Sequence, residues 1–339
     1  MNALPPGDMP LALTMGEPAG ISGEITLKTW LRRDEGLPPF FAIDDPSRLQ
    51  ATAGRLGLTV PLAPIDRPEH AAMAFSSALP VIPLPLAEPS VPGRLSAANQ
   101  PSVRAAIETA ASFALQGRVS GMVTNPIHKR ALYGSGFDYP GHTEFLAALA
   151  GVDRSVMMLA CPALRVVPVT IHVSLAEAIR TLNSDLILRT AVIVAEALAR
   201  DFGVSRPRLA LAGLNPHAGE EGALGLEDGA IIAPAVAELK ALGIQAFGPV
   251  APDSLFSERS RAGYDAAVCM YHDQALIPIK ALDFDGAVNV TLGLPFIRTS
   301  PDHGTALDIA GTGMANEASL MAALRLAGEM AEARAKASA

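Results

Sequence analysis

The hydrophobic residues of this chain fall into short runs that are separated by longer stretches with a helical pattern. Six runs have the length of a β-strand, at residues 11–14, 121–124, 165–172, 208–214, 266–271 and 287–291. Residues 185–200, in contrast, combine good helix formers with an acid in the first turn and an arginine at the end, as the helix dipole favours. Strands that alternate with helices of this length predict βαβ units and a largely parallel, covered α/β sheet.

Two segments between these elements differ in what they predict. After residues 11–14 comes Met15-Gly16-Glu17-Pro18-Ala19-Gly20, and a helical stretch follows from about Glu24, so we expect a strand, a tight turn and a helix. Residues 83–101 are crowded with proline, serine and alanine. This composition predicts an extended surface connection without chemistry.

Length, charge and cysteine content exclude several classes of protein. The 339 residues suffice for two domains or for one α/β unit with two lobes. Apolar runs fall short of the about 18 residues that cross a bilayer, and the first residues lack a secretion signal, so we expect a soluble, cytoplasmic protein. The net charge of −8 and scattered basic residues argue against nucleic-acid binding. Cys161 and Cys269 lie in or beside apolar runs, which suits buried thiols.

Three histidines share one setting, because His172, His217 and His272 each come at the end of an apolar run. In open α/β sheets ligands bind beyond the carboxyl ends of the strands, so these imidazoles could converge on one ion. Three neutral imidazoles would suit zinc, cobalt or nickel, with positions left open for a substrate. Each histidine taken singly is equally consistent with a structural side chain.

Two further segments have the chemistry of anion sites. His142, Thr143 and Glu144 begin a helical stretch, where backbone N–H groups receive a phosphate or where Thr143 caps the helix. Lys129 follows another strand-like run and would hold an anion or remain solvated.

The densest stretch is residues 280–313. Lys280, Asn289 and Arg298 suit a small phosphorylated and carboxylated substrate, because an arginine fork and a lysine point charge both bind such anions. Gly304, Gly311 and Gly313 permit a tight loop near a nucleotide, although the dinucleotide fingerprint G-x-G-x-x-G does not occur in the chain. The residues alone therefore indicate a metal-assisted α/β enzyme of unknown substrate.

From about Leu11 to about Ala323 the chain resembles the 4-hydroxythreonine-4-phosphate dehydrogenase family of vitamin B6 biosynthesis. The segments that carry the resemblance, in the family's order, are TMGEPAGISGE, PGHTEFLA, GLNPHAGEEGALGLED, GPVAPDSLF, MYHDQALIPIK and TLGLPFIRTSPDHGTALDIAGTG. Two departures concern the first turn: Ile21-Ser22-Gly23-Glu24 replaces a sequence that more often has Gly-Pro before the Glu, and Glu17 stands where an Asp is common.

The resemblance implies an architecture and an assembly. The fold would be like that of isocitrate and isopropylmalate dehydrogenases, with two α/β/α lobes around a central cleft. We expect residues 1–134 plus 285–339 to form the cofactor-side lobe, and residues 135–284 to form the lobe for metal, substrate and dimerisation. The family forms homodimers whose active sites are shared between the chains.

The resemblance also implies a role for each matching residue. His172, His217 and His272 would bind one divalent ion, such as zinc, cobalt or magnesium. The substrate would be bound by His142, Thr143, Lys280, Asn289 and Arg298. The segment HGTALDIAGTG is similar to the adenosine-binding loop of isocitrate and isopropylmalate dehydrogenases, which implies that NAD or NADP is bound by His303, Gly304, Thr305, Ala306, Asp308 and Gly311.

The implied reaction oxidises the C3 hydroxyl of 4-phosphohydroxy-L-threonine with NAD or NADP and then removes CO2, which leaves 3-amino-2-oxopropyl phosphate. Asp253 and Asp273 are the candidate proton acceptors, although Asp273 could equally orient His272. One alternative is a related dehydrogenase that acts on threonate or erythronate 4-phosphate or on an aromatic cis-dihydrodiol. Another is a binding protein that has kept the fold and lost turnover.

Overall fold

The computed structural model describes residues 9–133, 139 and 141–338. The chain divides into two compact units, which are described separately: unit 1 comprises Met1–Arg154 and Leu294–Ala339, and unit 2 comprises Ser155–Gly293. Unit 1 extends to residue 154, where the predicted lobe ended at residue 134, and unit 2 extends to residue 293, where the predicted lobe ended at residue 284. The differences arise because helix α6 (His142–Ala150) packs on unit 1, whereas strand β11 (Val288–Leu292) pairs with a strand of unit 2.

Unit 1 is built on a parallel sheet with strand order β3-β4-β2-β1-β5-β12. Its strands are β1 (Leu11–Thr14), β2 (Phe40–Asp44), β3 (Leu62–Pro64), β4 (Leu79–Pro83), β5 (Gly121–Val123) and β12 (Arg298–Pro301). Its helices, besides α6, are α1 (Ser22–Leu31), α2 (Pro46–Leu56), η2 (Pro68–His70), α3 (Ala71–Phe75), α4 (Gln100–Leu115), α5 (Lys129–Tyr133) and α13 (Ala318–Ser338).

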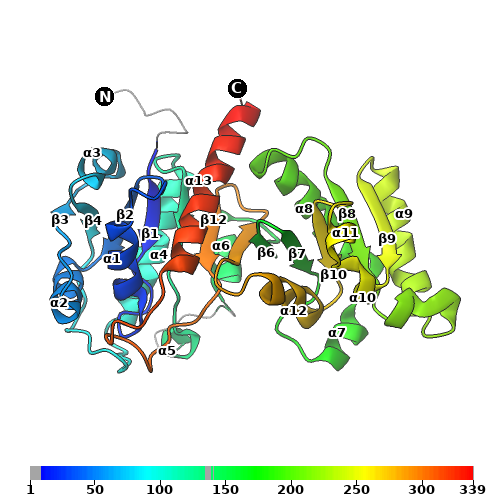
Figure 1. Cartoon of the computed structure of the whole chain (residues 1–339), viewed down its shortest axis with the longest axis horizontal. Helices are drawn as coiled ribbons and strands as arrows, with labels where there is room; N and C mark the ends of the chain where they lie inside the picture. Colours follow the sequence, from blue (N-terminus) through cyan, green and yellow to red (C-terminus); the bar gives the residue numbers. More distant parts are fainter. Residues whose placement is uncertain (1–8, 134–138, 140, 339) are drawn as a thin grey trace. The chain divides into compact units, whose positions relative to one another are not determined.

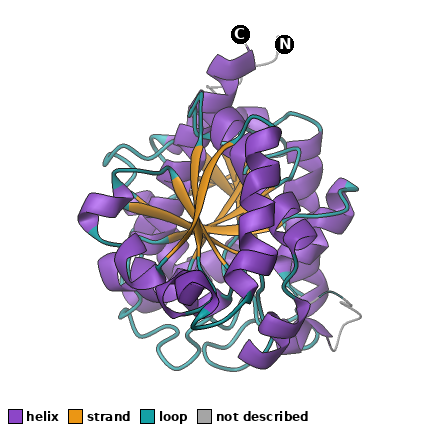
Figure 2. Cartoon of the chain, turned by 90° about the vertical axis from the view of Figure 1, so that its right-hand side faces the viewer, coloured by secondary structure: helices purple, strands orange, loops and turns teal. Residues whose placement is uncertain are grey.

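Helices cover both faces of this sheet, as the cartoon views show (Figures 1 and 2). Alternate residues of a strand point to opposite faces. Ala12 of β1 and Phe41 of β2 therefore pack on the same side, in one cluster with residues of α4. Helices α1 and α13, which contact each other, lie in front of the strands in Figure 1. A sheet buried on both faces accounts for the nearly continuous apolar runs of the sequence.

Unit 2 has the strand order β11-β6-β7-β10-β8-β9 and mixes two kinds of pairing. Strands β7, β10, β8 and β9 pair in parallel, whereas β6 pairs antiparallel with both β11 and β7. The remaining strands are β6 (Val156–Cys161), β7 (Leu164–Pro168), β8 (Arg208–Ala212), β9 (Gln245–Val250) and β10 (Ala266–Cys269). The helices are α7 (Leu175–Thr181), α8 (Ser184–Asp201), η3 (Pro216–Gly222), η4 (Asp228–Ile232), α9 (Ala233–Ala241), α10 (Pro252–Leu255), α11 (Glu258–Arg261) and α12 (His272–Leu282).

The predicted α/β class and all six predicted strands are confirmed, and the predicted helix at residues 185–200 is α8. Asn183 caps α8, since its side chain accepts a hydrogen bond from the Leu186 N–H. The strand predicted at residues 165–172 ends earlier, at Pro168. In the described part of the chain, none of the helices is long and apolar enough to cross a membrane.

Candidate active site

The three histidines predicted to bind a metal all follow strands of unit 2, and hydrogen bonds connect the ends of these strands. Strand β10 lies between β7 and β8. The Thr170 hydroxyl, after β7, donates to the Met270 carbonyl after β10 at 2.8 Å. The buried Gln274 side chain accepts from the Met270 N–H at 2.7 Å and donates to the carbonyl of Gly213, after β8, at 2.6 Å. The segments that carry the histidines are thus held at one edge of the sheet.

His172 and His272 lie close together in the same chain. Their ring centroids are 6.1 Å apart, and both rings line a cavity of about 240 Å³. The His272 Nδ1 lies 2.7 Å from the Asp273 carboxylate. A carboxylate accepts a hydrogen bond from Nδ1–H, which leaves the lone pair of Nε2 for an ion. His172 has a φ of 54°, a left-handed conformation that non-glycine residues rarely adopt and that often marks a functional site.

His217 is placed differently, because it is exposed in η3 and does not line that cavity. Five consecutive residues, 217–221, have φ between 43° and 79°. Such a left-handed turn is costly and needs support from its surroundings. The buried Asp228 carboxylate supplies part of this support, since it accepts hydrogen bonds from the backbone N–H groups of Leu214 and Asn215 at 2.8 and 3.1 Å.

Two of the three histidines predicted to bind a divalent metal lie close enough together within the chain to do so. Among the described residues, no three His, Cys, Asp or Glu side chains gather closely enough to hold a metal ion. His172 and His272 nevertheless offer two imidazoles across one cavity, with an acidic residue that orients one of them. Imidazole is a preferred ligand of zinc and cobalt. Two of the three predicted ligands are therefore suitably placed within one chain, and a third ligand would have to come from outside this cavity.

Unit 1 contains a separate cluster of cationic and polar groups around Arg298. Arg298 begins β12 next to β5 and is buried, with 3% of its surface exposed. Burial lowers the pKa of its guanidinium to about 10, so the group stays charged at neutral pH. Its Nη2 and Nε donate to the Thr124 hydroxyl at 2.6 and 3.2 Å. These two hydrogen bonds hold the Arg298 guanidinium in one orientation. Its buried setting strengthens its attraction for an anion.

His142, at the first position of α6, faces the same positive charges. Its pKa lies well below the usual value, first because the ring is desolvated and then because Arg298 and Lys129 are positive. The imidazole is therefore neutral, and its buried Nε2 has no partner among the described residues. Gly141 is the N-cap residue of α6 and makes no side-chain hydrogen bond to the helix. Two cations and a neutral imidazole at the start of a helix are groups that bind phosphate, and the nearby Glu144 carboxylate balances part of the positive charge.

The lowered pKa of His142 predicts how stability depends on pH. The unfolded chain takes up a proton on this histidine below about pH 6.5, whereas the folded chain does not. The contribution to stability is therefore complete above that pH and is lost as the pH falls, by at most about 1.4 kcal/mol per pH unit. We expect His142→Gln to unfold with a smaller decrease in urea midpoint between pH 7.5 and 5.5 than the parent. Equal decreases would show that His142 titrates normally in the folded state.

The remaining predicted site residues belong to unit 2. Lys280 lies on α12 with its ammonium 5.1 Å from the centre of the Phe284 ring, and Asn289 lies on β11 with a buried Oδ1 that lacks a partner among the described residues. The Asp273 carboxylate is occupied by His272, which favours an orienting role. Asp253 is exposed on α10, which contacts η3.

The predicted cofactor residues lie on an irregular loop of unit 1, residues 302–317. This loop contacts the first turn, because the Ile21 N–H donates to the Thr305 carbonyl at 3.1 Å. It also contacts the connection at residues 83–101, where Gly93 lies against the Leu307 carbonyl and Pro92 against Gly311. A segment that we predicted to carry no chemistry therefore supports the candidate cofactor loop.

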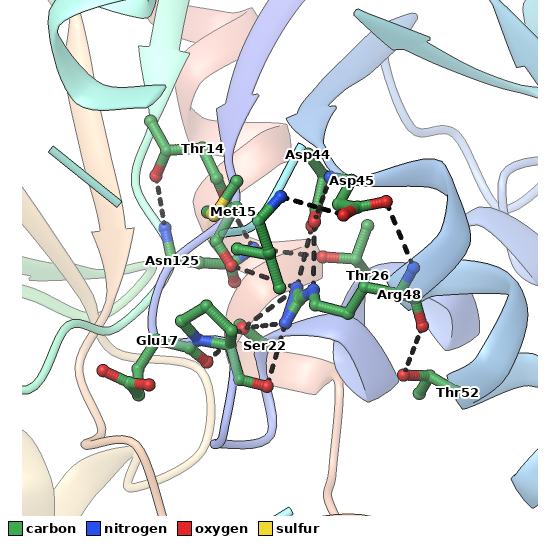
Figure 3. A network of polar contacts seen from close by, with 12 residues as sticks. Thr14, Met15, Glu17, Ser22, Thr26, Asp44, Asp45, Arg48, Thr52 and Asn125 are labelled. Atoms are coloured by element: carbon green, nitrogen blue, oxygen red, sulfur yellow. Dashed lines mark hydrogen bonds and ion pairs between the residues drawn. The ribbon is translucent and has the colours of Figure 1, made fainter. Parts of the chain in front are cut away.

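The first turn itself is held by the buried Arg48 (Figure 3). Its guanidinium pairs with Asp44 at 2.8 Å and donates to the carbonyls of Met15 and Pro18 at 3.3 and 3.2 Å. The two unusual sequence features of the turn are also accommodated: the Ser22 hydroxyl donates to the Glu17 carbonyl at 2.9 Å, and the Glu17 carboxylate accepts from the Ala19 N–H at 3.1 Å. The departures from the family pattern thus form part of the turn.

Sequence reasoning missed several residues that shape these sites. Thr124 and Gln274 act through side-chain hydrogen bonds between segments, and Asp228 accepts hydrogen bonds from backbone N–H groups 13 and 14 residues before it. The only local signal was their position, since Thr124 ends a predicted strand and Gln274 follows His272 by two residues.

Comparison with known proteins identifies the family. Residues 37–327 match the family model described as "Pyridoxal phosphate biosynthetic protein PdxA". The chain belongs to the PdxA family. A 4-hydroxythreonine-4-phosphate dehydrogenase from Bradyrhizobium diazoefficiens is 54% identical, over 96% of this chain and 98% of the relative. The resemblance drawn from the sequence is thereby confirmed.

Solved structures agree with this family. A 4-hydroxythreonine-4-phosphate dehydrogenase from Klebsiella pneumoniae superposes with a TM-score of 0.87 at 39% identity, covering 95% of this chain and 99% of the other. A terephthalate 1,2-cis-dihydrodiol dehydrogenase from Burkholderia xenovorans has a TM-score of 0.65 at 29% identity, covering 95% and 98%. This chain is thus more similar to the enzyme from Klebsiella pneumoniae than to the enzyme from Burkholderia xenovorans, in both sequence and fold.

Proposed function

We propose that this protein is a metal-dependent 4-hydroxythreonine-4-phosphate dehydrogenase that uses NAD or NADP and works in the cytoplasm. The observation that carries the proposal is the 54% identity to a relative of that name over nearly the full length of both chains. The cluster of Arg298, His142 and Lys129 supports it, because a phosphorylated substrate needs such a site. The greater similarity to the 4-hydroxythreonine-4-phosphate dehydrogenase from Klebsiella pneumoniae than to the terephthalate dihydrodiol dehydrogenase favours the phosphorylated substrate.

The proposed reaction has two steps, and the residues described above would serve both. The hydroxyl carbon of 4-phosphohydroxy-L-threonine gives a hydride to the nicotinamide while its hydroxyl proton passes to a base, and the resulting 3-oxo acid loses CO2. We propose Asp253 as the proton acceptor and Asp273 as the residue that orients His272. Arg298, His142 and Thr143 would bind the phosphate, and Lys280 and Asn289 would also contact the substrate.

The divalent ion would be held by His172, His217 and His272. When bound, such an ion would acidify the substrate hydroxyl and stabilise the enolate that remains after decarboxylation. The placement of His172 and His272 about one cavity supports this assignment for two of the ligands.

The test is an assay for NADH formation by the metal-loaded protein. We expect the absorbance of NADH to rise with 4-phosphohydroxy-L-threonine, and to rise far less with threonate or erythronate 4-phosphate. The reverse preference would identify a sugar-acid phosphate dehydrogenase. No turnover of any of them, despite measurable NADH binding, would favour a binding protein.

We further propose a homodimer in which His217 completes the metal site of the partner subunit. His217 lies outside the cavity of His172 and His272, and the segments that follow the three histidines in sequence carry several exposed apolar side chains. They are Val173, Leu175, Ile179, Leu224, Leu226, Ile277 and Phe284. Such side chains are typical of surfaces that associate.

Mixing inactive variants tests this arrangement. His217→Ala and His272→Ala, re-associated as a mixed dimer, should regain activity, because one of the two sites then has all three histidines. His172→Ala with His272→Ala should regain none, since both residues belong to one cavity of one chain. Activity in the second mixture and not in the first would contradict the shared site.

A further inference from the structure

The candidate cofactor loop, residues 302–317, has a few hydrogen bonds of its own between residues 306 and 314, and its two ends are held by another segment. It contains no helix or strand, and three of its residues, Ala306, Gly311 and Gly313, have φ of 44°, 73° and 83°. Backbone of this kind is held by its neighbours rather than by regular hydrogen bonding. The neighbours that hold it therefore control whether the loop can receive a cofactor.

The beginning of the loop is held by the start of α1. The Thr305 carbonyl accepts the hydrogen bond from Ile21, and Gly20 approaches the same carbonyl so closely that a Cβ on Gly20 would lie 2.6 Å from it. Only glycine permits this approach.

The end of the loop is held by the next turns of α1. The Lys28 ammonium donates to the carbonyls of Gly313 and Ala315 at 2.8 and 2.7 Å, and to the Glu24 carboxylate at 2.9 Å. The same Glu24 oxygen accepts from the Ala315 N–H at 3.0 Å. Lysine has three N–H donors, and all three are used here. Glu24 is 1% exposed and Lys28 19%, so these bonds are largely shielded from water.

We propose that Glu24 and Lys28 are positioning residues that hold the loop in the conformation that binds the nicotinamide cofactor. This inference rests on the proposed function, which assigns the loop to NAD or NADP. Neither residue touches the cofactor in this proposal. Their effect is on the fraction of molecules whose loop is ready to bind, because an apparent dissociation constant rises in inverse proportion to that fraction.

We call Glu24 and Lys28, with their hydrogen bonds to the loop, the clamp. The variant that tests the clamp has to remove both charges. Lys28→Met alone would leave the buried Glu24 carboxylate unpaired and would destabilise the fold for an unrelated reason. Glu24→Gln combined with Lys28→Met removes the pair, keeps an acceptor for the Ala315 N–H and loses both bonds to the loop carbonyls. Glu108→Gln combined with Arg104→Met is the matched control, since it removes an i,i+4 ion pair of helix α4, with an N–O distance of 2.7 Å, whose two partners lie outside the loop.

Two measurements decide the proposal. Without cofactor, amides of the loop should exchange with deuterium faster in the Glu24→Gln, Lys28→Met variant than in the parent or in the Glu108→Gln, Arg104→Met control. The dissociation constant for NADH, measured by its fluorescence, should rise about tenfold if the competent fraction falls to about a tenth. Cobalt binding should match the parent, which shows that unit 2 remains folded. Gly20→Ala, which disturbs the other end of the loop, should produce the same pair of changes.

The contrary outcomes separate this inference from the proposed function. If loop exchange in both variants equals that of the parent, the clamp does not order the loop and the proposal is overturned. If exchange rises while the NADH dissociation constant stays constant, the loop is ordered by the clamp but does not bind the cofactor. That result would overturn both the positioning role and the cofactor assignment, whether or not dehydrogenase activity is present.

Discussion

His272→Ala is expected to lose stoichiometric binding of zinc or cobalt and to lower kcat/KM by about a thousandfold. The reason is that His272 shares a cavity with His172, so removing its imidazole takes away one of the two proposed ligands that lie together in the chain. A catalytic metal contributes several kcal/mol to a reaction of this kind, and each 1.36 kcal/mol is a factor of ten. Metal content after dialysis and steady-state kinetics with NAD measure the two effects.

The control is His70→Ala, which removes an exposed histidine of unit 1 that pairs with Asp66 at 2.9 Å. It should leave metal content and kinetics unchanged. Asp273→Asn should lie between the two, since loss of an orienting carboxylate typically lowers metal affinity about ten- to a hundredfold. If His272→Ala retained metal with the affinity of the parent, the assignment of the ligands would be wrong.

The placement of the histidines shows how far strand patterns alone could lead. The apolar runs before His172 and His272 predicted strands β7 and β10, and those strands are neighbours in the sheet. The pattern could not predict the backbone conformation after β7. The strand ends at Pro168, and His172 itself adopts a left-handed conformation. That conformation depends on contacts such as Thr170 with Met270, which are 100 residues apart in sequence.

The antiparallel part of unit 2 was missed for a local reason. The strand predicted at residues 165–172 left residues 156–164 unassigned, although they contain β6 and the first residue of β7, which pair at Cys161 and Leu164 around Pro162 and Ala163. A proline within an apolar run is a recognised signal for such a turn.

The contacts of Glu24 and Lys28 with the candidate cofactor loop could not be predicted from the sequence. Glu24 and Lys28 are four residues apart, which predicts an ordinary ion pair on the surface of a helix. Their partners Gly313 and Ala315 lie 285 or more residues away, and no spacing indicates that connection. Residue type could suggest the groups that bind anions and metals, whereas the residues that position loops emerged only from the packing.

Arg298→Lys is expected to lower kcat/KM for the phosphorylated substrate by about ten- to two-hundredfold. The planar fork of arginine can grip two anionic oxygens, and a lysine loses bonds to a charged group that are worth about 1.5 to 3 kcal/mol. The buried position adds to the loss, because the same desolvation that lowers the pKa of Arg298 to about 10 would act on a lysine, which begins from a lower pKa than arginine. Metal content should stay at the parent value.

The matched control is Arg325→Lys, since Arg325 lies in the same unit and donates to the Glu35 carbonyl at 2.9 Å on the surface. It should leave the kinetics unchanged. The decisive comparison is between substrate and cofactor. Arg298→Lys should raise KM for the phosphorylated substrate, while the dissociation constant of NADH should stay constant. If NADH binding weakened and the substrate KM did not change, Arg298 would act through the cofactor loop, which follows β12 directly, and the anion site would lose its central residue.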